Sequence, residues 1–211
     1  EDAEEVVAGI VEAGGEAVAV RGNAGKPEHQ ERLVAETTEA LGAPSVLVAN
    51  AASGPMGKTS EIDFESHAKC LAWNGAGFAN LARLCVEAGG MDDDGRIVAV
   101  TALGSRRHIP SYGAMGPAKA AMEGMVRMLA VEYAPRGITV NAVSPGITDT
   151  KMLSYFKERE QILAGGVART PAGRLGTAED AARSIVLFCL PLSGWITGQT
   201  IDADGGFTVS C

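Results

Sequence analysis

A tyrosine and a lysine stand where an apolar segment gives way to a helical pattern, at Tyr112 and Lys119. A phenol can donate a hydrogen bond to a developing oxyanion, and a neighbouring ammonium favours its phenolate form. Residues seven apart in a helix lie within ~20° of the same face, so both side chains would point into one cleft. Three interpretations are open: a catalytic pair, two ordinary helix residues, or a pair that has lost its tyrosine, because Met115 stands four positions before the lysine.

The composition narrows the function classes. The chain has 211 residues, of which 46% are hydrophobic, and a net charge of -8 from 18 basic and 26 acidic side chains. This length and hydrophobic content favour a single domain over residues 1–211. Nucleic acid is not expected as a partner, because phosphate binding requires a concentrated basic face. No apolar run reaches the ~18 residues that span a bilayer and no signal peptide is visible, so we expect a soluble cytoplasmic protein without a membrane partner.

The cysteines and histidines do not form a metal-binding pattern. The cysteines are far apart and none is in a CxxC spacing, so neither a structural zinc nor a redox motif is expected. We interpret these residues as core thiols and surface imidazoles. They are Cys70, Cys85, Cys189 and Cys211, with His29, His67 and His108.

Short apolar runs alternate with amphipathic segments along the chain, which is the pattern of an α/β fold. The apolar runs are rich in Val, Ile and Ala without polar alternation, as expected when helices cover both faces of a sheet. Each connection is long enough for a crossover helix, so we predict a doubly wound, Rossmann-like parallel sheet. The predicted strands are 16–22, 45–51, 96–102, 139–145 and 199–206, and the predicted helices lie near 26–41, 60–88, 112–134 and 177–190.

The first residues read as a helix that ends at Gly14 and Gly15. A Rossmann-type sheet starts instead with a strand and a glycine-rich turn that cradles a pyrophosphate. No GxGxxG or GxxxGxG spacing occurs in such a setting. We therefore expect that the chain lacks an N-terminal β-α-β portion of ~30–40 residues. Strand 16–22 would then have no neighbour, and strand 45–51 would have an unpaired edge.

Four segments carry a family resemblance. VLVANAASG is similar to an Asn-Asn-Ala-Gly strand end, WNGAG to a helical Asn-x-x-Gly motif, and GITVNAVSPGITDT to a Val-Asn-x-x-x-Pro-Gly-x-x-x-Thr motif. The segment from PAGRLGTAED to DADGG is similar to a C-terminal signature of the same family. In this order and at this spacing, the chain resembles the short-chain dehydrogenase/reductase family over essentially its whole length.

Most members of that family carry the tyrosine where this chain has Met115. The spacing of Tyr112 and Lys119 resembles the Tyr-x6-Lys pair of the family's enoyl-acyl-carrier-protein reductases, above all the type III enzyme of bacterial fatty acid biosynthesis. The resemblance implies an NAD(P)H-dependent oxidoreductase that reduces the 2,3 double bond of an enoyl thioester. Tyr112 would donate to the carbonyl oxygen. Lys119 would hold the nicotinamide ribose and lower the pKa of the tyrosine, and Asn74 would support the lysine.

A serine that polarises the carbonyl in the family falls at Ala102. An enoyl reductase tolerates this loss better than a ketone reductase, whose alkoxide forms directly beneath the serine hydroxyl. Thr101 is expected to face the other side of the strand, because side chains alternate. Ser105, in the following loop, could contribute a hydroxyl.

A set of further residues is expected at the cofactor. Open α/β sheets bind ligands at the carboxyl ends of their strands, which favours the end of strand 45–51, although an asparagine there can also be a plain turn residue. The resemblance implies that Pro145 and its successors contact the nicotinamide end, that Asn23 lies near the adenine, and that the cofactor is NADP(H) rather than NAD(H). The expected cofactor contacts are Asn23, Asn50, Ala51, Ala52, Lys119, Pro145, Gly146, Ile147 and Thr150.

Segment 149–170 and a pair of arginines could serve the substrate. The segment is either a lid whose apolar residues cover an acyl chain or an ordinary surface helix; those residues are Met152, Leu153, Tyr155, Phe156, Ile162 and Leu163. Arg106 and Arg107 could attract an acidic carrier protein or be merely solvated. By resemblance, the long helices 60–88 and 112–134 and the Asp-Gly-Gly end imply a homodimer or homotetramer.

Two alternatives to an enoyl reductase stay open. One is a ketone or 3-oxoacyl reductase of the same family that uses Tyr112 in place of the usual tyrosine. The other is a catalytically impaired family member that acts as a binding or oligomer partner, since the usual tyrosine and serine positions hold Met115 and Ala102.

Overall fold

Four parallel strands form the sheet in the described part of this computed structural model, which covers residues 2–150, 153 and 159–210. They are β1 (Val46–Ala49), β2 (Arg96–Val100), β3 (Thr139–Pro145) and β4 (Thr200–Ala203), in sequential order. Every neighbouring pair is parallel, with Ile97 in register with Leu47 on one side and Val140 on the other. The predicted parallel sheet is confirmed.

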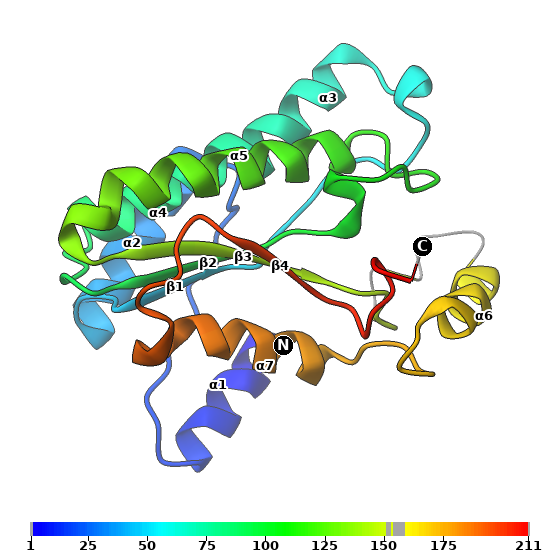
Figure 1. The fold of residues 1–211 in the computed structure, drawn as a ribbon. Helices are drawn as coiled ribbons and strands as arrows, with labels where there is room; N and C mark the ends of the chain where they lie inside the picture. The colour runs from blue at the N-terminus through cyan, green and yellow to red at the C-terminus, as the bar shows by residue number, and fades with distance from the viewer. Residues whose placement is uncertain (1, 151–152, 154–158, 211) are drawn as a thin grey trace.

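Helices cover both faces of this sheet (Figure 1). On one face lie α2 (Pro27–Leu41), α4 (Gly77–Glu87) and α5 (Met115–Tyr133), and on the other lies α7 (Ala178–Cys189). The larger core packs between the sheet and the first group, with Ile97 and Val126 fully buried. A smaller core packs against α7 and contains Val98, Val143 and Phe188. The strands β2 and β3 are buried almost throughout, as expected when helices cover both faces of a sheet, so the doubly wound architecture is confirmed.

The predicted strand at 16–22 is wrong: these residues form neither a strand nor a helix. They follow α1 (Asp2–Glu12), which lies on the α7 side of the sheet (Figure 1). A strand needs a neighbour for its backbone hydrogen bonds, and within the described residues none pairs with this segment or with the outer edge of β1. An apolar run alone therefore does not make a strand, and Val18 is 42% exposed.

The predicted helix at 60–88 is a chain of shorter elements. It consists of a 3-10 turn, η1 (Thr59–Glu61), then α3 (Phe64–Leu71), a π-helical turn, η2 (Ala72–Ala76), and α4. The Asp63 carboxylate accepts the backbone N–H of Ser66 at 2.9 Å and so caps α3. A π turn inside a helix inserts an extra residue and is frequent at functional sites. Asn74 lies in this turn.

Helix α5 begins at Met115, not at residue 112, so Tyr112 lies ahead of the helix. Ser111 has φ of 61° in the left-handed region, which breaks the helical path. The loop at Gly57 then fastens the backbone on both sides of the tyrosine. Gly57 N–H donates to the Ser111 carbonyl at 2.8 Å, and Gly113 N–H donates to the Gly57 carbonyl at 3.0 Å. The helical-face argument therefore does not apply to Tyr112, whose position is set by this long-range pairing.

The remaining elements are short turns and α6 (Arg159–Arg169). The turns are η3 (Leu103–Ser105), η4 (Ala134–Arg136) and η6 (Pro191–Ser193). At the start of α7, Asp180 N–H donates to the Thr177 hydroxyl at 3.1 Å and the Asp180 carboxylate accepts Thr177 N–H at 2.8 Å, a capping box. None of the described helices is long and apolar enough to cross a membrane.

Candidate active site

The loops that follow the carboxyl ends of β2, β3 and β4 enclose a cavity of about 530 Å³, here called the Tyr112 cavity. Ligands of open α/β sheets bind at this end of the strands. The cavity is lined by Ala102, Leu103 and Gly104 after β2, Ile109, Pro110 and Tyr112 before α5, Ser144 to Thr148 at the end of β3, Leu153, Gln161, Ile162, Gly165, Gly166 and Arg169 around α6, and Asp204, Phe207 and Thr208 after β4.

Most of the lining is apolar, with aliphatic side chains such as Ile109, Ile147 and Ile162. The Arg169 guanidinium lies 4.8 Å from the centre of the Phe207 ring, a cation–π contact. The Asp204 carboxylate is held by the backbone N–H groups of its own turn, at Gly206 (2.9 Å) and Thr208 (2.8 Å). An apolar cavity with a few polar groups suits a ligand with a hydrocarbon part.

The Tyr112 ring borders the cavity and packs on Gly104, where a Cβ would overlap the ring. Burial raises the pKa of the Tyr112 phenol above its usual value, so the group is protonated at neutral pH. The expectation that Lys119 lowers this pKa and favours phenolate is wrong, because burial dominates. No hydrogen bond holds the hydroxyl among the residues that the structure describes, so it can donate to a ligand.

Met115, at the position where most members of the resembled family carry the tyrosine, lies in a buried cluster against which Tyr112 also packs. Its sulfur is 3.6 Å from the Cys70 sulfur and 4.0 Å from the Asn74 amide nitrogen. A Cβ at Gly54 would lie 2.6 Å from the Met115 sulfur, so the cluster is filled. Position 115 is core and does not border the Tyr112 cavity.

Lys119 is buried in α5, with its amine donating to the Val100 carbonyl at the end of β2, at 2.6 Å. Burial lowers the pKa of Lys119 from 10.5 to about 8, because an ammonium loses hydration in the interior. In the described structure the amine makes no hydrogen bond to the Tyr112 hydroxyl, and Lys119 does not line the Tyr112 cavity. Convergence of the two groups on one ligand stays a prediction.

Asn74 in the π turn is also buried. Its amide donates to the Ser53 carbonyl at 2.9 Å and to the Cys70 carbonyl at 2.8 Å. Its side-chain oxygen is buried and has no partner within the described residues, although buried polar atoms are nearly always paired. No hydrogen bond joins Asn74 to Lys119. The unpaired oxygen and the buried amine fit a ligand with hydroxyl groups, such as the ribose of a nicotinamide cofactor.

The segment after β3 holds three of the predicted cofactor contacts in the cavity wall: Pro145, Gly146 and Ile147. Gly146 N–H donates to the Ala203 carbonyl at 3.0 Å, and a Cβ there would lie 2.7 Å from the Asp204 Cα. Only glycine fits so close an approach of two backbones. Thr150, predicted with them, is exposed and lies outside the lining.

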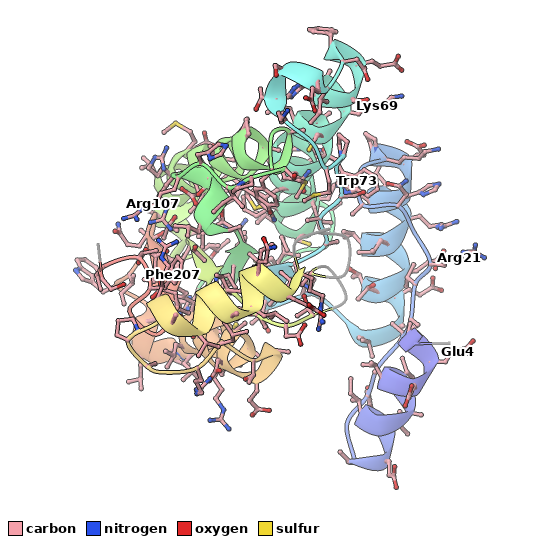
Figure 2. All side chains as sticks on the ribbon, turned by 90° about the vertical axis from the view of Figure 1, so that its right-hand side faces the viewer. Glu4, Arg21, Lys69, Trp73, Arg107 and Phe207 are labelled. Carbon is pink, nitrogen blue, oxygen red and sulfur yellow. The ribbon has the colours of Figure 1, made fainter. Side chains whose placement is uncertain are left out.

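The other predicted cofactor residues lie away from the Tyr112 cavity. After β1, Asn50 and Ala51 are exposed, while Ala52 packs against the Cys70 and Met115 cluster. Asn23 lines a second cavity of about 420 Å³ beside Trp73, and its side-chain oxygen accepts Gly25 N–H at 2.9 Å. Figure 2 shows Trp73 and Phe207, which mark the two cavities, on opposite sides of the view. None of these residues lines the Tyr112 cavity, although Ala52 and Tyr112 pack against the same cluster.

The strand end after β2 divides its side chains between the cavity and the core. Ala102 lines the cavity, whereas the Thr101 hydroxyl points the other way and donates to the Glu123 carboxylate at 2.8 Å. This confirms the expected alternation. The Ser105 hydroxyl also donates to that carboxylate, at 2.6 Å, and does not line the cavity. Neither hydroxyl replaces the serine missing at position 102.

The two arginines beside the cavity are both engaged. Arg106 forms an ion pair with Asp202 of β4, with Nη1 at 3.0 Å from Oδ2. Arg107 donates to the Thr208 carbonyl at 2.9 Å. Both guanidinium groups are therefore engaged within the chain, which leaves less positive charge here for binding a carrier protein.

Two of the apolar residues predicted for a lid, Leu153 and Ile162, line the cavity. Leu163 is half-buried outside the lining. Met152, Tyr155 and Phe156 lie outside the described residues.

Sequence reasoning missed several wall residues, notably Thr148, Ile109 and Phe207. Thr148 belongs to the GITVNAVSPGITDT segment and could have been included, whereas no sequence motif marks Ile109 or Phe207. No three His, Cys, Asp or Glu side chains in the described structure gather into a possible metal site.

Comparison with known proteins gives the family. The model of the family described as "Enoyl-(Acyl carrier protein) reductase" matches residues 1–208. The chain is 36% identical over 209 residues to a 1-cyclohexenylcarbonyl-CoA reductase of Streptomyces collinus, covering 98% of this chain and 74% of that protein. It is 35% identical over 133 residues to the NADH-dependent enoyl-[acyl-carrier-protein] reductase FabI of Escherichia coli, covering 63% of this chain and 50% of that protein.

Solved structures agree. A short-chain dehydrogenase/reductase from Serratia marcescens superposes with a TM-score of 0.88 at 27% identity, covering 98% of this chain and 82% of the other. A blue fluorescent protein from a metagenomic library, in complex with NADPH, gives 0.86 at 26% identity, covering 97% and 81%. With the α/β fold and a tyrosine-lined cavity at the carboxyl edge of the sheet, these matches show that the chain is an oxidoreductase that belongs to the short-chain dehydrogenase/reductase family, among its enoyl-(acyl carrier protein) reductase-like members.

Proposed function

We propose that this protein reduces the 2,3 double bond of an enoyl thioester with NADPH. The observation that carries the proposal is Tyr112: a protonated phenol, with a hydroxyl available to a ligand, on the wall of an apolar cavity. Such a group can hold a thioester carbonyl oxygen while hydrocarbon fills the rest of the cavity. The activities in the names of the Streptomyces and Escherichia relatives support the same reaction class.

The chain's own groups divide the work as follows. When bound, a reduced nicotinamide would supply a hydride to the β-carbon of the substrate, and the resulting enolate would take up a proton from solvent at the α-carbon. Tyr112 donates a hydrogen bond to the carbonyl oxygen as negative charge develops there, and its raised pKa keeps it a donor. Lys119 and the unpaired Asn74 oxygen would hold the ribose, and Pro145 to Ile147 would border the nicotinamide. The aliphatic wall excludes water from the reacting atoms.

Position 102 favours an enoyl over a ketone substrate. In ketone reduction the carbonyl oxygen becomes an alkoxide that needs a strong donor set and a proton. Ala102 supplies no second hydroxyl, and both nearby hydroxyls, of Thr101 and Ser105, are turned to Glu123. An enolate needs fewer hydrogen-bond donors than an alkoxide, because its negative charge is shared between carbon and oxygen.

We propose NADPH because the NADPH-bound structure resembles this chain over 97% of its length. The Escherichia relative is named for NADH, so both cofactors belong in the assay. Coenzyme A and an acidic carrier protein are both suitable carriers of the acyl group. Homodimer or homotetramer assembly is proposed as well, supported by large exposed apolar side chains next to α7, Trp195 at 99% and Leu192 at 94%; light scattering measures it.

The test is a comparison of crotonyl and acetoacetyl thioesters, each with NADPH and NADH. We expect oxidation of the reduced cofactor with the crotonyl thioester, faster with NADPH. Turnover of the acetoacetyl thioester alone would assign a ketone reductase. Absence of turnover together with no cofactor binding in calorimetry would assign a binding role and overturn the proposal.

A further inference from the structure

A buried carboxylate lies behind the wall of the Tyr112 cavity. Glu123, one turn after Lys119 in α5, is 6% exposed and does not line the cavity. One of its oxygens, Oε1, accepts hydrogen bonds from the Thr101 hydroxyl at 2.8 Å and the Ser105 hydroxyl at 2.6 Å. Hydrogen bonds to a buried carboxylate are stronger than those between neutral groups. Glu123 therefore ties the end of β2 and the turn η3 to the helix.

The turn that Glu123 holds is also the support of Tyr112. Gly104, between the two ends of η3, packs directly under the Tyr112 ring. Its carbonyl oxygen would lie 2.6 Å from a Cβ at Gly116, so the turn and the first turn of α5 meet backbone to backbone. Gly116 N–H in turn donates to the Tyr112 carbonyl at 2.9 Å. A shift of η3 must move the tyrosine or the start of the helix.

A second strand joins the same network. Arg106, the residue after η3, has its Nε 3.9 Å from Glu123 Oε1, and its guanidinium pairs with Asp202 of β4. The Glu123 carboxylate thus faces two hydroxyls and the Arg106 guanidinium, and these contacts offset the free-energy cost of burying it. The end of β2, the turn η3 and α5 are held together through this one side chain, and Arg106 links it to β4.

We infer that Glu123 is a positioning residue, which fixes η3 under the Tyr112 ring and so sets where the phenol meets a substrate. It touches no ligand itself. The effect on catalysis rests on the proposed role of Tyr112, but the effect on the position of the tyrosine does not. Measuring the Tyr112 pKa needs no substrate, so it tests the positioning role of Glu123 separately from the proposed reaction.

The experiment measures the pKa of Tyr112 and the rate of thioester reduction in the same variants. Glu123→Ala removes both hydroxyl contacts, Glu123→Gln keeps an oxygen that accepts them, and Glu39→Ala, an exposed glutamate of α2, is the matched control. Absorbance titration of the tyrosines, with Tyr112→Phe as the blank, measures the Tyr112 pKa. In Glu123→Ala we expect this pKa to fall towards its usual value as the ring gains water, with Gln and the control unchanged.

In the kinetic arm we expect kcat of Glu123→Ala to fall about 100-fold, the scale of a small misplacement of a reacting group, with KM little changed and Gln restoring most of the rate. If Glu123→Ala titrates and turns over like the parent, the inference is wrong. If the parent has no enoyl reductase activity, the titration still decides the positioning role, and only the proposed function fails.

Milder variants cover the case in which Glu123→Ala does not fold, as judged by circular dichroism. Thr101→Val and Ser105→Ala each remove one hydroxyl and leave the carboxylate in place. We expect each to lower the Tyr112 pKa and kcat by a smaller step, and the pair to act non-additively because they share one acceptor. If Thr101→Val, Ser105→Ala and the double variant all keep the parental Tyr112 pKa and kcat, the inference is wrong.

Discussion

The two sides of the α5 start are built for opposite purposes. Tyr112 borders an apolar cavity, with a hydroxyl available to a ligand, whereas Met115, three residues later, is buried, does not border that cavity and contacts Cys70 and Asn74. The first position offers a donor where a substrate can reach it, and the second offers packing. On the proposed role of Tyr112, a phenol serves the reaction at position 112 and would be misplaced at position 115.

The largest effect is expected from moving the phenol between these sites. In Tyr112→Phe combined with Met115→Tyr, the introduced phenol must enter a filled cluster next to Gly54. We expect kcat with a crotonyl thioester to stay about 100- to 1000-fold below the parent, the usual cost of one oxyanion donor. The double variant should also lose ~1–3 kcal/mol in free energy of unfolding through overpacking.

Enzyme kinetics and urea unfolding measure this double variant, with Met115→Leu as the control for the loss of the sulfur contacts. Recovery of the rate to within tenfold of the parent would mean that position 115 opens onto the cavity, and the contrast between the two sites would fail.

A smaller effect is expected at the floor under the tyrosine. Gly104→Ala places a methyl group against the Tyr112 ring, so the ring must shift. We expect kcat to fall between about 10- and 100-fold. Gly124→Ala on α5, where the nearest atom to an added Cβ is 3.9 Å away, is the matched control and should keep the parental rate. Equal rates in both variants would show that the ring does not depend on η3.

The smallest effect concerns stability, at Lys119. Its pKa is about 8 in the folded protein against 10.5 ordinarily. Below pH 8 the amine is charged in both states and the cost of burying it is fully present. Between pH 8 and 10.5 the folded state loses its proton first, so the free energy of unfolding rises with pH. We expect a rise of roughly 2 kcal/mol from this group between pH 7 and 9.5.

Lys119→Met should lack that rise, and Lys69→Met, on the exposed face of α3, should keep it. Urea unfolding of the three proteins at the two pH values measures the difference. A parallel pH dependence in the parent and Lys119→Met would contradict the burial of a titrating amine at this position.

Much of the fold could be predicted from sequence because it rests on local patterns. The runs at β2 and β3 are rich in Val, Ile and Ala and are buried almost throughout, and the Thr177 cap marks the start of α7. Segment 16–22 has the same local pattern, yet it is coil, because strand formation also requires a partner for the backbone. The strand prediction for residues 16–22 failed because the segment has no partner strand in the described structure, not because its composition is unsuited to a strand.

Only some of the residues predicted for the site lie in the wall of the Tyr112 cavity, and their geometry was not predicted. The spacing pointed to Tyr112 and Lys119, and Pro145 to Ile147 do line the cavity. The helix start was wrong because Gly57, far away in the chain, fixes the backbone around the tyrosine. Glu123 was missed for a similar reason: a glutamate in a helix gives no sign of burial, and its hydroxyl partners come from β2 and η3.

The most direct measurement is the rate of Tyr112→Phe with a crotonyl thioester and NADPH, beside its thermal unfolding midpoint. The change removes one hydroxyl and keeps the ring on Gly104, so we expect kcat to fall about 100- to 1000-fold with an unchanged midpoint. A variant that reduces the thioester as fast as the parent would show that the phenol at position 112 is not the donor.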